Sequence, residues 1–157
     1  MSLPTSLGTA VLRRATRADL PGVVALLAQD ELGTGRDDPD GDLEPYLRAF
    51  DAIDADPAHL LVVAEVDDEL VGTLQLTVLP SLPHHGAFRG QLEGVHVRAD
   101  QRGAGLGAAM VGWAVDEARR RGCAQVQLTS QKRRTDAHRF YERLGFAKSH
   151  DGFKLML

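Results

Sequence analysis

The spacing of apolar residues changes along the chain, and these changes predict where strands and helices lie. Two aliphatic runs, Leu60–Val66 and Leu70–Leu79, flank three acidic residues, a pattern that predicts an antiparallel β-hairpin. From Leu106 to Ala118 apolar residues recur every three or four positions instead, which is typical of an amphipathic helix. Gly122 follows that helix at its expected end.

Capping residues and further apolar runs predict the remaining elements. Thr16 and Asp19 have the spacing of a helix start, so we expect a helix from there to about Gln29. We expect additional strands at 10–15, 91–97, 124–129 and 153–157, and additional helices at 43–54 and 135–144. This order predicts an α/β protein with a mixed sheet of about six to seven strands and four helices.

Composition and charge narrow the class of protein. A chain of 157 residues with 43% hydrophobic and 25% charged residues is typical of one globular domain, here spanning 1–157. A net charge of -4 argues against a nucleic-acid partner. We expect a cytoplasmic protein without a membrane partner, because Cys123 is the single cysteine and no apolar stretch approaches the ~18 residues of a membrane span.

The most informative segment is the glycine-rich stretch 101–107, between an expected strand and the long helix. Glycines before a helix N-terminus let a large anion approach unpaired N–H groups, as in pyrophosphate-binding turns. The segment lacks the Lys and Ser or Thr of a Walker loop. Gly103, Gly105 and Ala108 do satisfy the dinucleotide pattern G-x-G-x-x-A, but the next strand ends at Leu128-Thr129-Ser130 without the acid that holds a ribose.

Two motifs resemble those of a known family. The stretch 102–107 resembles the Arg/Gln-x-x-Gly-x-Gly/Ala motif of the GNAT (GCN5-related N-acetyltransferase) superfamily. The stretch 137–146 is similar to the late helix of that family, with Ala-x-x-Phe-Tyr followed by Leu-Gly-Phe. The two motifs occur in the family's order and spacing, so the resemblance implies a GNAT-type fold.

The resemblance also implies acetyl-CoA as cosubstrate and no metal. Backbone amides of the turn Arg102, Gly103, Ala104, Gly105, Leu106 and Gly107 would hold the pyrophosphate. The strand Val95, His96 and Val97 would pair with the pantetheine arm and polarise the thioester carbonyl. Phe140 and Tyr141 would also contact the coenzyme, and Ser130 or Gln131 stands where family members often have an asparagine.

Two side chains are candidates for proton transfer. Tyr141 corresponds to the tyrosine that many GNAT enzymes place beside the coenzyme sulfur, where its hydroxyl can protonate the leaving thiolate. Glu93 is the candidate base for the amine, with His96 as a second choice. Strict strand alternation would place Glu93 on the face of Val95 and Val97, opposite His96. A packed tyrosine and an edge-exposed or salt-bridged carboxylate are the structural alternatives.

The resemblance therefore implies an N-acetyltransferase in which an amine attacks acetyl-CoA directly in a ternary complex. A non-catalytic acyl-CoA-binding or sensing module and a Rossmann-like dinucleotide enzyme are the alternatives. The acceptor, a small molecule or a peptide amine, should contact the regions 30–46 and 79–89. The first region contains Asp37, Asp38, Asp40, Asp42 and Glu44, which could attract a cationic amine or simply be solvated. A homodimer is compatible with the sequence.

Overall fold

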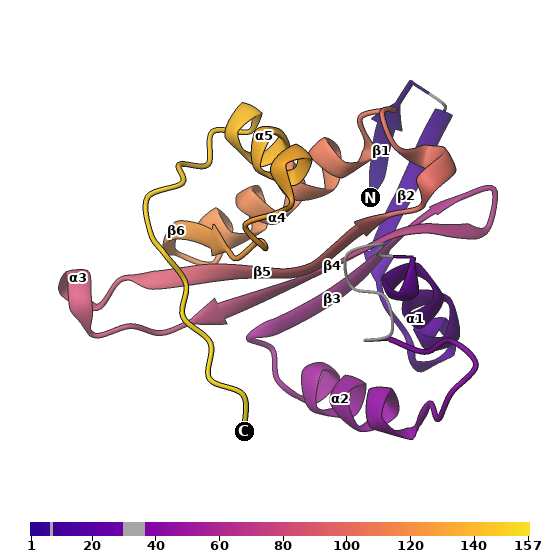
Figure 1. Cartoon of the computed structure of the whole chain (residues 1–157), viewed down its shortest axis with the longest axis horizontal. Coiled ribbons are helices and arrows are strands. Elements are labelled where there is room, and N and C mark those ends of the chain that lie inside the picture. The colour runs from indigo at the N-terminus through magenta and orange to yellow at the C-terminus, as the bar shows by residue number, and fades with distance from the viewer. Residues whose placement is uncertain (7, 30–36) are drawn as a thin grey trace.

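The protein is built around one curled β-sheet with helices on both faces (Figure 1). The computed structural model describes residues 1–6, 8–29 and 37–157. Helices α4 (Leu106–Arg120) and α5 (Thr135–Arg143) lie on one face of the sheet, and α1 (Leu20–Ala28) and α2 (Glu44–Ala55) lie on the other. The predicted connection at 31–42 lies largely outside the described residues.

The described residues form a six-stranded sheet whose spatial order follows the chain. Its neighbours are antiparallel except for the last two strands, which are parallel and confirm the predicted mixed sheet. The first strand was not predicted, because it is short and contains Pro4, which is tolerated at a sheet edge. The strands are β1 (Ser2–Thr5), β2 (Gly8–Arg14), β3 (His59–Val66), β4 (Glu69–Leu79), β5 (Phe88–Val97) and β6 (Cys123–Leu128).

The helix boundaries follow the predicted caps. Asp19 Oδ2 accepts hydrogen bonds from the Thr16 backbone N–H at 2.7 Å and from its hydroxyl at 2.8 Å, which fixes the entry to α1 through a short 3-10 turn. Gly122 and Gly145 follow α4 and α5 with φ of 78° and 89°, values that favour glycine. The segment α3 (Pro83–Gly86) is a tight turn rather than a regular helix, because His84 and His85 have φ of 56° and 60°, and it lies where the sequence predicted a loop.

Two apolar clusters hold the helices against the sheet. Alternate residues of β3 and β4, among them Val62, Leu74 and Leu76, are fully buried beneath α4. On the opposite face Val63 packs with Phe50 of α2 and with the apolar side of α1. Helices therefore pack against both faces of the sheet along β3 and β4, and this packing fixes the position of the neighbouring strand β5.

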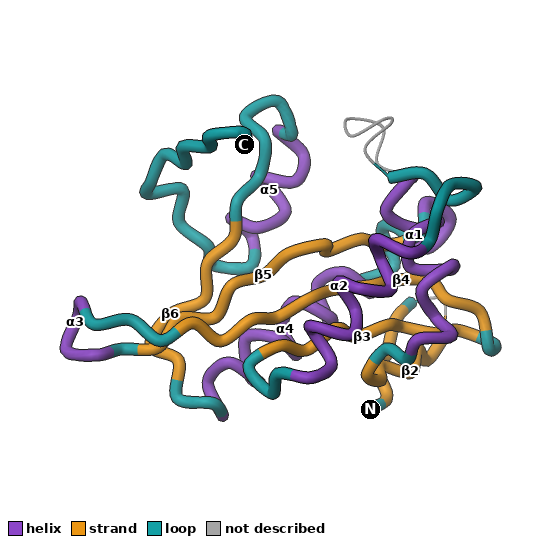
Figure 2. The backbone as a smooth tube through the Cα atoms, turned by 90° about the horizontal axis from the view of Figure 1, so that it is seen from below, coloured by secondary structure: helices purple, strands orange, loops and turns teal. Residues whose placement is uncertain are grey.

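The predicted terminal strand 153–157 is absent, and this expectation was wrong. Residues 147–157 carry no regular secondary structure and are exposed throughout. Figure 2 shows this tail as a loop that stands away from β5 and β6. Apolar alternation gives the period of a strand, but the strand forms only where another strand supplies its hydrogen bonds.

Candidate active site

The glycine-rich turn leads directly into α4. Gly103 and Gly105 have φ of 79° and 88°, so both occupy the left-handed region, and Gly105 caps the helix. A Cβ built on either glycine would meet no heavy atom within 4 Å. Glycine is therefore required here by backbone conformation rather than by crowding, and space is open beside the turn.

This turn exposes backbone donors. The N–H of Ala109 bonds to the carbonyl of Gly105 at 3.0 Å, so the amides before it have no carbonyl one turn earlier. Arg102 Nε donates to the carbonyl of Val97 at 3.0 Å and ties the turn to the end of β5. An anion beside the turn would meet these amides and the positive end of the helix dipole.

A bulge interrupts β5 just before the turn. Thr73 on β4 pairs with His96, and Gln75 pairs with Glu93, so two residues of β5 stand opposite one residue of β4. Gly94, within the bulge, has φ of 57°. This conformation turns the backbone of β5 locally and is the left-handed glycine typical of such bulges.

The bulge corrects the expected facing of Glu93. Residues opposite each other in an antiparallel pair share a face, and Thr73 and Gln75 are two positions apart. Glu93 and His96 therefore share the face of α1 and α2, whereas Val97, opposite Gly72, points to the face of α4. The alternation predicted from sequence was wrong because it assumed an unbroken strand.

Strands β5 and β6 separate beyond Leu92, the last residue of β5 that pairs with β6. A cavity of about 290 Å³ opens beside the unpaired part of β5. Val95, His96 and Val97, three of the predicted coenzyme contacts, line it together with Arg102. Its other walls come from the end of α1 and the start of α5, namely Gln29, Arg133, Arg134, Thr135, Asp136 and Ala137.

Tyr141 lies on α5, one turn after the cavity-lining Ala137. Its ring packs edge-to-face against Phe140, with centroids 5.1 Å apart, and against Phe146 at 5.7 Å. Burial raises the pKa of Tyr141, so the phenol stays protonated well above neutral pH. Within the described ranges its hydroxyl has no protein hydrogen-bond partner.

The segment after β6 is held by α5. The carbonyl of Gln131 lies 3.0 Å from His138 Nε2 and accepts the N–H of Arg134 at 3.0 Å, so His138 has a structural role. Ser130 is half-buried beside this cap. Phe140 lies against the start of α4, where a Cβ on Gly107 would be 3.5 Å from its ring.

A row of polar side chains that sequence reasoning missed extends from Glu93 toward the start of β5. Arg89 and Gln91 alternate with it on the same face, and Gln91 Oε1 accepts from Gln127 Nε2 of β6 at 2.9 Å. Arg89 is half-buried, and its Nε is buried without a hydrogen-bond partner in the described part of the chain. No carboxylate in the described ranges forms an ion pair with it. The register places Thr77, Gln75 and Gln125 on this face too.

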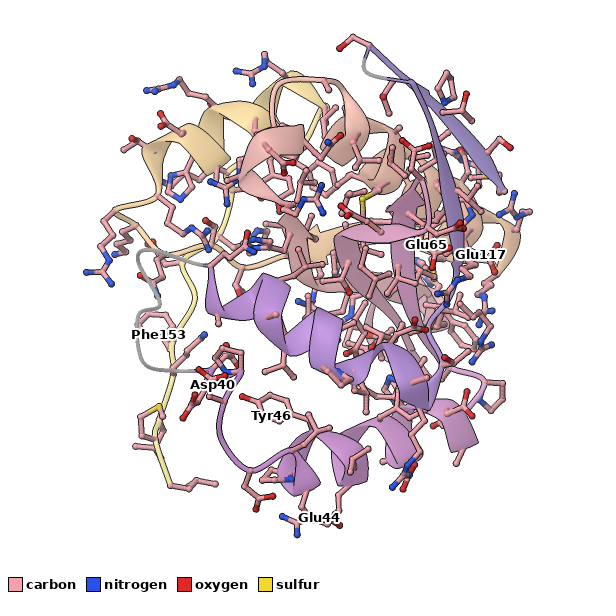
Figure 3. All side chains as sticks on the ribbon, turned by 90° about the vertical axis from the view of Figure 1, so that its right-hand side faces the viewer. Asp40, Glu44, Tyr46, Glu65, Glu117 and Phe153 are labelled. Carbon is pink, nitrogen blue, oxygen red and sulfur yellow. The ribbon has the colours of Figure 1, made fainter. Side chains whose placement is uncertain are left out.

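In the acidic segment before α2, described carboxylates accept hydrogen bonds from residues at the start of α2. Asp42 Oδ1 accepts the N–H of Glu44 at 2.9 Å, and Tyr46 donates to Asp37 Oδ1 at 3.1 Å. Figure 3 shows Asp40, Glu44 and Tyr46 around the start of α2. The carboxylates of Asp37 and Asp42 therefore stabilise the segment locally.

The backbone groups and the cavity of this site fit coenzyme A. The turn offers amides to a pyrophosphate, the unpaired stretch of β5 offers N–H and C=O groups to an amide-bearing arm, and the cavity joins the two. Among the described residues no group of three or more His, Cys, Asp or Glu side chains could hold a metal. Burial raises the pKa of Cys123, which suits a packed thiol rather than a nucleophile.

Comparison with known proteins identifies the family. The profile of the acetyltransferase (GNAT) family matches residues 24–146, which include the turn, β5 and α5. The chain belongs to the GNAT family. It is accordingly an acyltransferase, and the GNAT family uses acetyl-CoA.

Individual relatives show a range of acceptors. The aminoalkylphosphonate N-acetyltransferase of Salmonella typhimurium is 32% identical over 145 residues, which cover 90% of this chain and 88% of that protein. The glucosamine 6-phosphate N-acetyltransferase of Trypanosoma brucei brucei is 35% identical over 82 residues, covering 52% of this chain and 53% of that protein. A crystal structure described as a transcriptional regulator from Bacillus halodurans superposes with a TM-score of 0.88 at 42% identity, covering 94% of this chain and 99% of the other.

The GNAT fold and the enzyme class predicted from the two motifs are thereby confirmed. The roles of individual residues stay predictions. No helix within the described residues is long and apolar enough to cross a membrane.

Proposed function

We propose that this GNAT enzyme acetylates the primary amine of a small molecule that also carries a phosphonate or phosphate group. The observation that carries this proposal is the relative aligned over 90% of the chain, whose name specifies an aminoalkylphosphonate. The second relative acts on glucosamine 6-phosphate, which likewise combines an amine with a phosphorus oxyanion.

The polar row on β5 supports an anionic acceptor. Arg89 has no carboxylate partner in the described ranges and could pair with an oxyanion, for which a guanidinium is well suited. Glu93 lies on the same face, four residues and about 13 Å along the strand. Such a separation favours an acceptor whose amine and anionic group are several bonds apart.

We assign the chemical roles as follows. Acetyl-CoA supplies the thioester carbon that the amine attacks. Glu93, directly or through water, takes the proton that the ammonium group loses, and backbone N–H groups of 95–97 stabilise the carbonyl oxygen. Tyr141 donates its phenolic proton to the sulfur as the C–S bond breaks. The nitrogen, now bonded to the acetyl carbon, gives up its second proton through solvent to the phenolate, which leaves the neutral amide and restores Tyr141.

A chain-length series tests the acceptor proposal. We would measure kcat/KM for ω-aminoalkylphosphonates of increasing length, glucosamine 6-phosphate, and the same amines without the phosphorus group. The phosphorus-bearing acceptors should be preferred by ~10-fold or more, and Arg89→Gln should remove this preference while leaving turnover of the neutral amines unchanged. Equal kcat/KM for both groups would refute the proposal, and a preference that survives Arg89→Gln would remove Arg89 from it.

A further inference from the structure

The N-terminal strand pair reaches the glycine-rich turn through one backbone hydrogen bond. The N–H of Ser6, directly after β1, donates to the carbonyl of Ala104 at 3.0 Å. Strand β1 lies against α4, and its Leu3 is buried in the same apolar cluster as Leu106, the first residue of α4. Figure 1 shows the turn between β1 and β2 next to the segment that leads into α4. Two segments that are distant in sequence therefore meet at the predicted pyrophosphate site.

This hydrogen bond sets the orientation of the peptide unit that joins Ala104 to Gly105. The described chain has no cis peptide bond, and in a trans peptide the C=O and the N–H point in opposite directions. Because the carbonyl of Ala104 points to Ser6, the N–H of Gly105 points away from β1. Among the described residues this N–H has no hydrogen-bond partner, so it is available to an anion.

The residues of the turn do not hold this orientation by themselves. Turning the peptide over changes mainly ψ of Ala104 and φ of Gly105, and a glycine accepts φ of either sign. The Ala104 side chain is buried, and the bond from Arg102 to the carbonyl of Val97 fixes only the beginning of the turn. The N–H of Ser6 is thus a contact from outside the turn that favours one of the two peptide orientations.

We propose that Ser6 is a positioning residue, whose backbone N–H holds the peptide 104–105 so that Gly105 presents its N–H to the pyrophosphate of acetyl-CoA. With the peptide turned over, the carbonyl oxygen of Ala104 would face the anion in place of this donor. Fixing the peptide before the coenzyme arrives reduces the ordering that binding requires. The inference rests on the proposed pyrophosphate site at this turn and is independent of the acceptor.

The variant Ser6→Pro removes the N–H with little other change. Pairing between β1 and β2 ends at Thr5 and Gly8, so Ser6 lies beyond the last ladder pair. Ser6 is exposed, and the described non-glycine residues with positive φ do not include it, so no left-handed backbone opposes the proline ring. Thr5 belongs to a strand, which is the conformation preferred before proline. Ser6→Ala keeps the N–H and is the matched control.

The expected effect is confined to ligands that carry the pyrophosphate. We would measure the affinity for coenzyme A by calorimetry and that for pantetheine, which lacks the pyrophosphate, by displacement. Ser6→Pro should weaken coenzyme A binding about three- to tenfold, the effect of one hydrogen bond, and leave pantetheine binding and the melting temperature unchanged. Ser6→Ala should match the wild type with both ligands.

Each other outcome contradicts a particular step. Unchanged coenzyme A affinity in folded Ser6→Pro would overturn the proposal, and an equal loss with pantetheine would also overturn it by indicating distortion of the whole site. Gly105→Val separates this failure from that of the pyrophosphate site: if Gly105→Val loses coenzyme A while Ser6→Pro binds normally, only the role of Ser6 is wrong. If both variants bind normally, the pyrophosphate site itself is wrong.

A measurement on the wild type decides if Ser6→Pro does not fold. Coenzyme A and the hydrogen bond favour the same peptide orientation, so saturating coenzyme A should slow amide hydrogen exchange at Ser6, whereas pantetheine should not. An exchange rate at Ser6 that coenzyme A leaves unchanged would overturn the proposal.

Discussion

The hydroxyl of Tyr141 can be removed with little other change, so Tyr141→Phe is a direct test of the acid assignment. The ring contacts with Phe140 and Phe146, at 5.1 Å and 5.7 Å, are available equally to phenylalanine. No described residue accepts from or donates to the hydroxyl. The free energy of unfolding should therefore change by less than about 1 kcal/mol.

The expected kinetic effect is much larger. A positioned general acid contributes ~10²–10⁴-fold in rate, which corresponds to about 3 to 5 kcal/mol of activation free energy. Because burial raises the pKa of Tyr141, the wild-type phenol is protonated through neutral pH and can donate. Tyr141→Phe should lower kcat by that factor and leave the affinity for acetyl-CoA nearly unchanged.

The assay is thiol release under saturating acetyl-CoA, with an acceptor for which chemistry limits the rate. Tyr141→Leu is the comparison variant: it should lose the same activity but also lose stability, because it removes the ring from the aromatic cluster. If folded Tyr141→Phe kept more than about half of the wild-type kcat, the acid assignment would be wrong and water would be the better proton donor.

Three further predictions concern the turn, the base and acid stability. Gly105→Val should weaken acetyl-CoA binding in calorimetry by ~100-fold or more, whereas Gly112→Ala, on the exposed side of α4, should bind normally. If folded Gly105→Val bound acetyl-CoA normally, the proposed pyrophosphate site at this turn would be wrong. Glu93→Gln should depress the rate most at low pH, where free amine is scarce, and an unchanged pH–rate profile would exclude the role. The ion pair with Arg13 lowers the pKa of Asp19 to about 2, so this carboxylate contributes about 2 kcal/mol of stability above pH ~4 that is lost as pH falls toward 2. In urea titrations Asp19→Asn should flatten that acid limb, and an equally steep limb would contradict the assignment.

Local signals predicted most of the fold because they depend on neighbouring residues. The Thr16–Asp19 cap, the glycines that end α4 and α5, and the acidic turn between β3 and β4 each act within a few positions. The glycine turn and the late helix likewise identified the family, since both motifs are continuous in sequence.

The sequence-based predictions failed where the local structure depends on residues that are distant in sequence. The bulge at Gly94 changes the facing of Glu93, and its signal was a glycine inside an otherwise regular strand. Arg89 became a candidate only when the strand register placed it beside two glutamines and away from any acid in the described ranges. The tail has the apolar period of a strand, but its pairing partner could not be read from that period.

The central claim, transfer of an acetyl group to an amine that carries a phosphorus oxyanion, is tested most directly by acceptor-dependent thiol release. An aminoalkylphosphonate and the isosteric alkylamine would be compared at equal concentrations with acetyl-CoA, and the product would be identified by mass spectrometry. We predict thiol release equimolar with N-acetylated phosphonate, at a kcat/KM at least ~10-fold above that of the plain amine. Absence of acceptor-dependent thiol release from folded protein that binds acetyl-CoA would contradict the account.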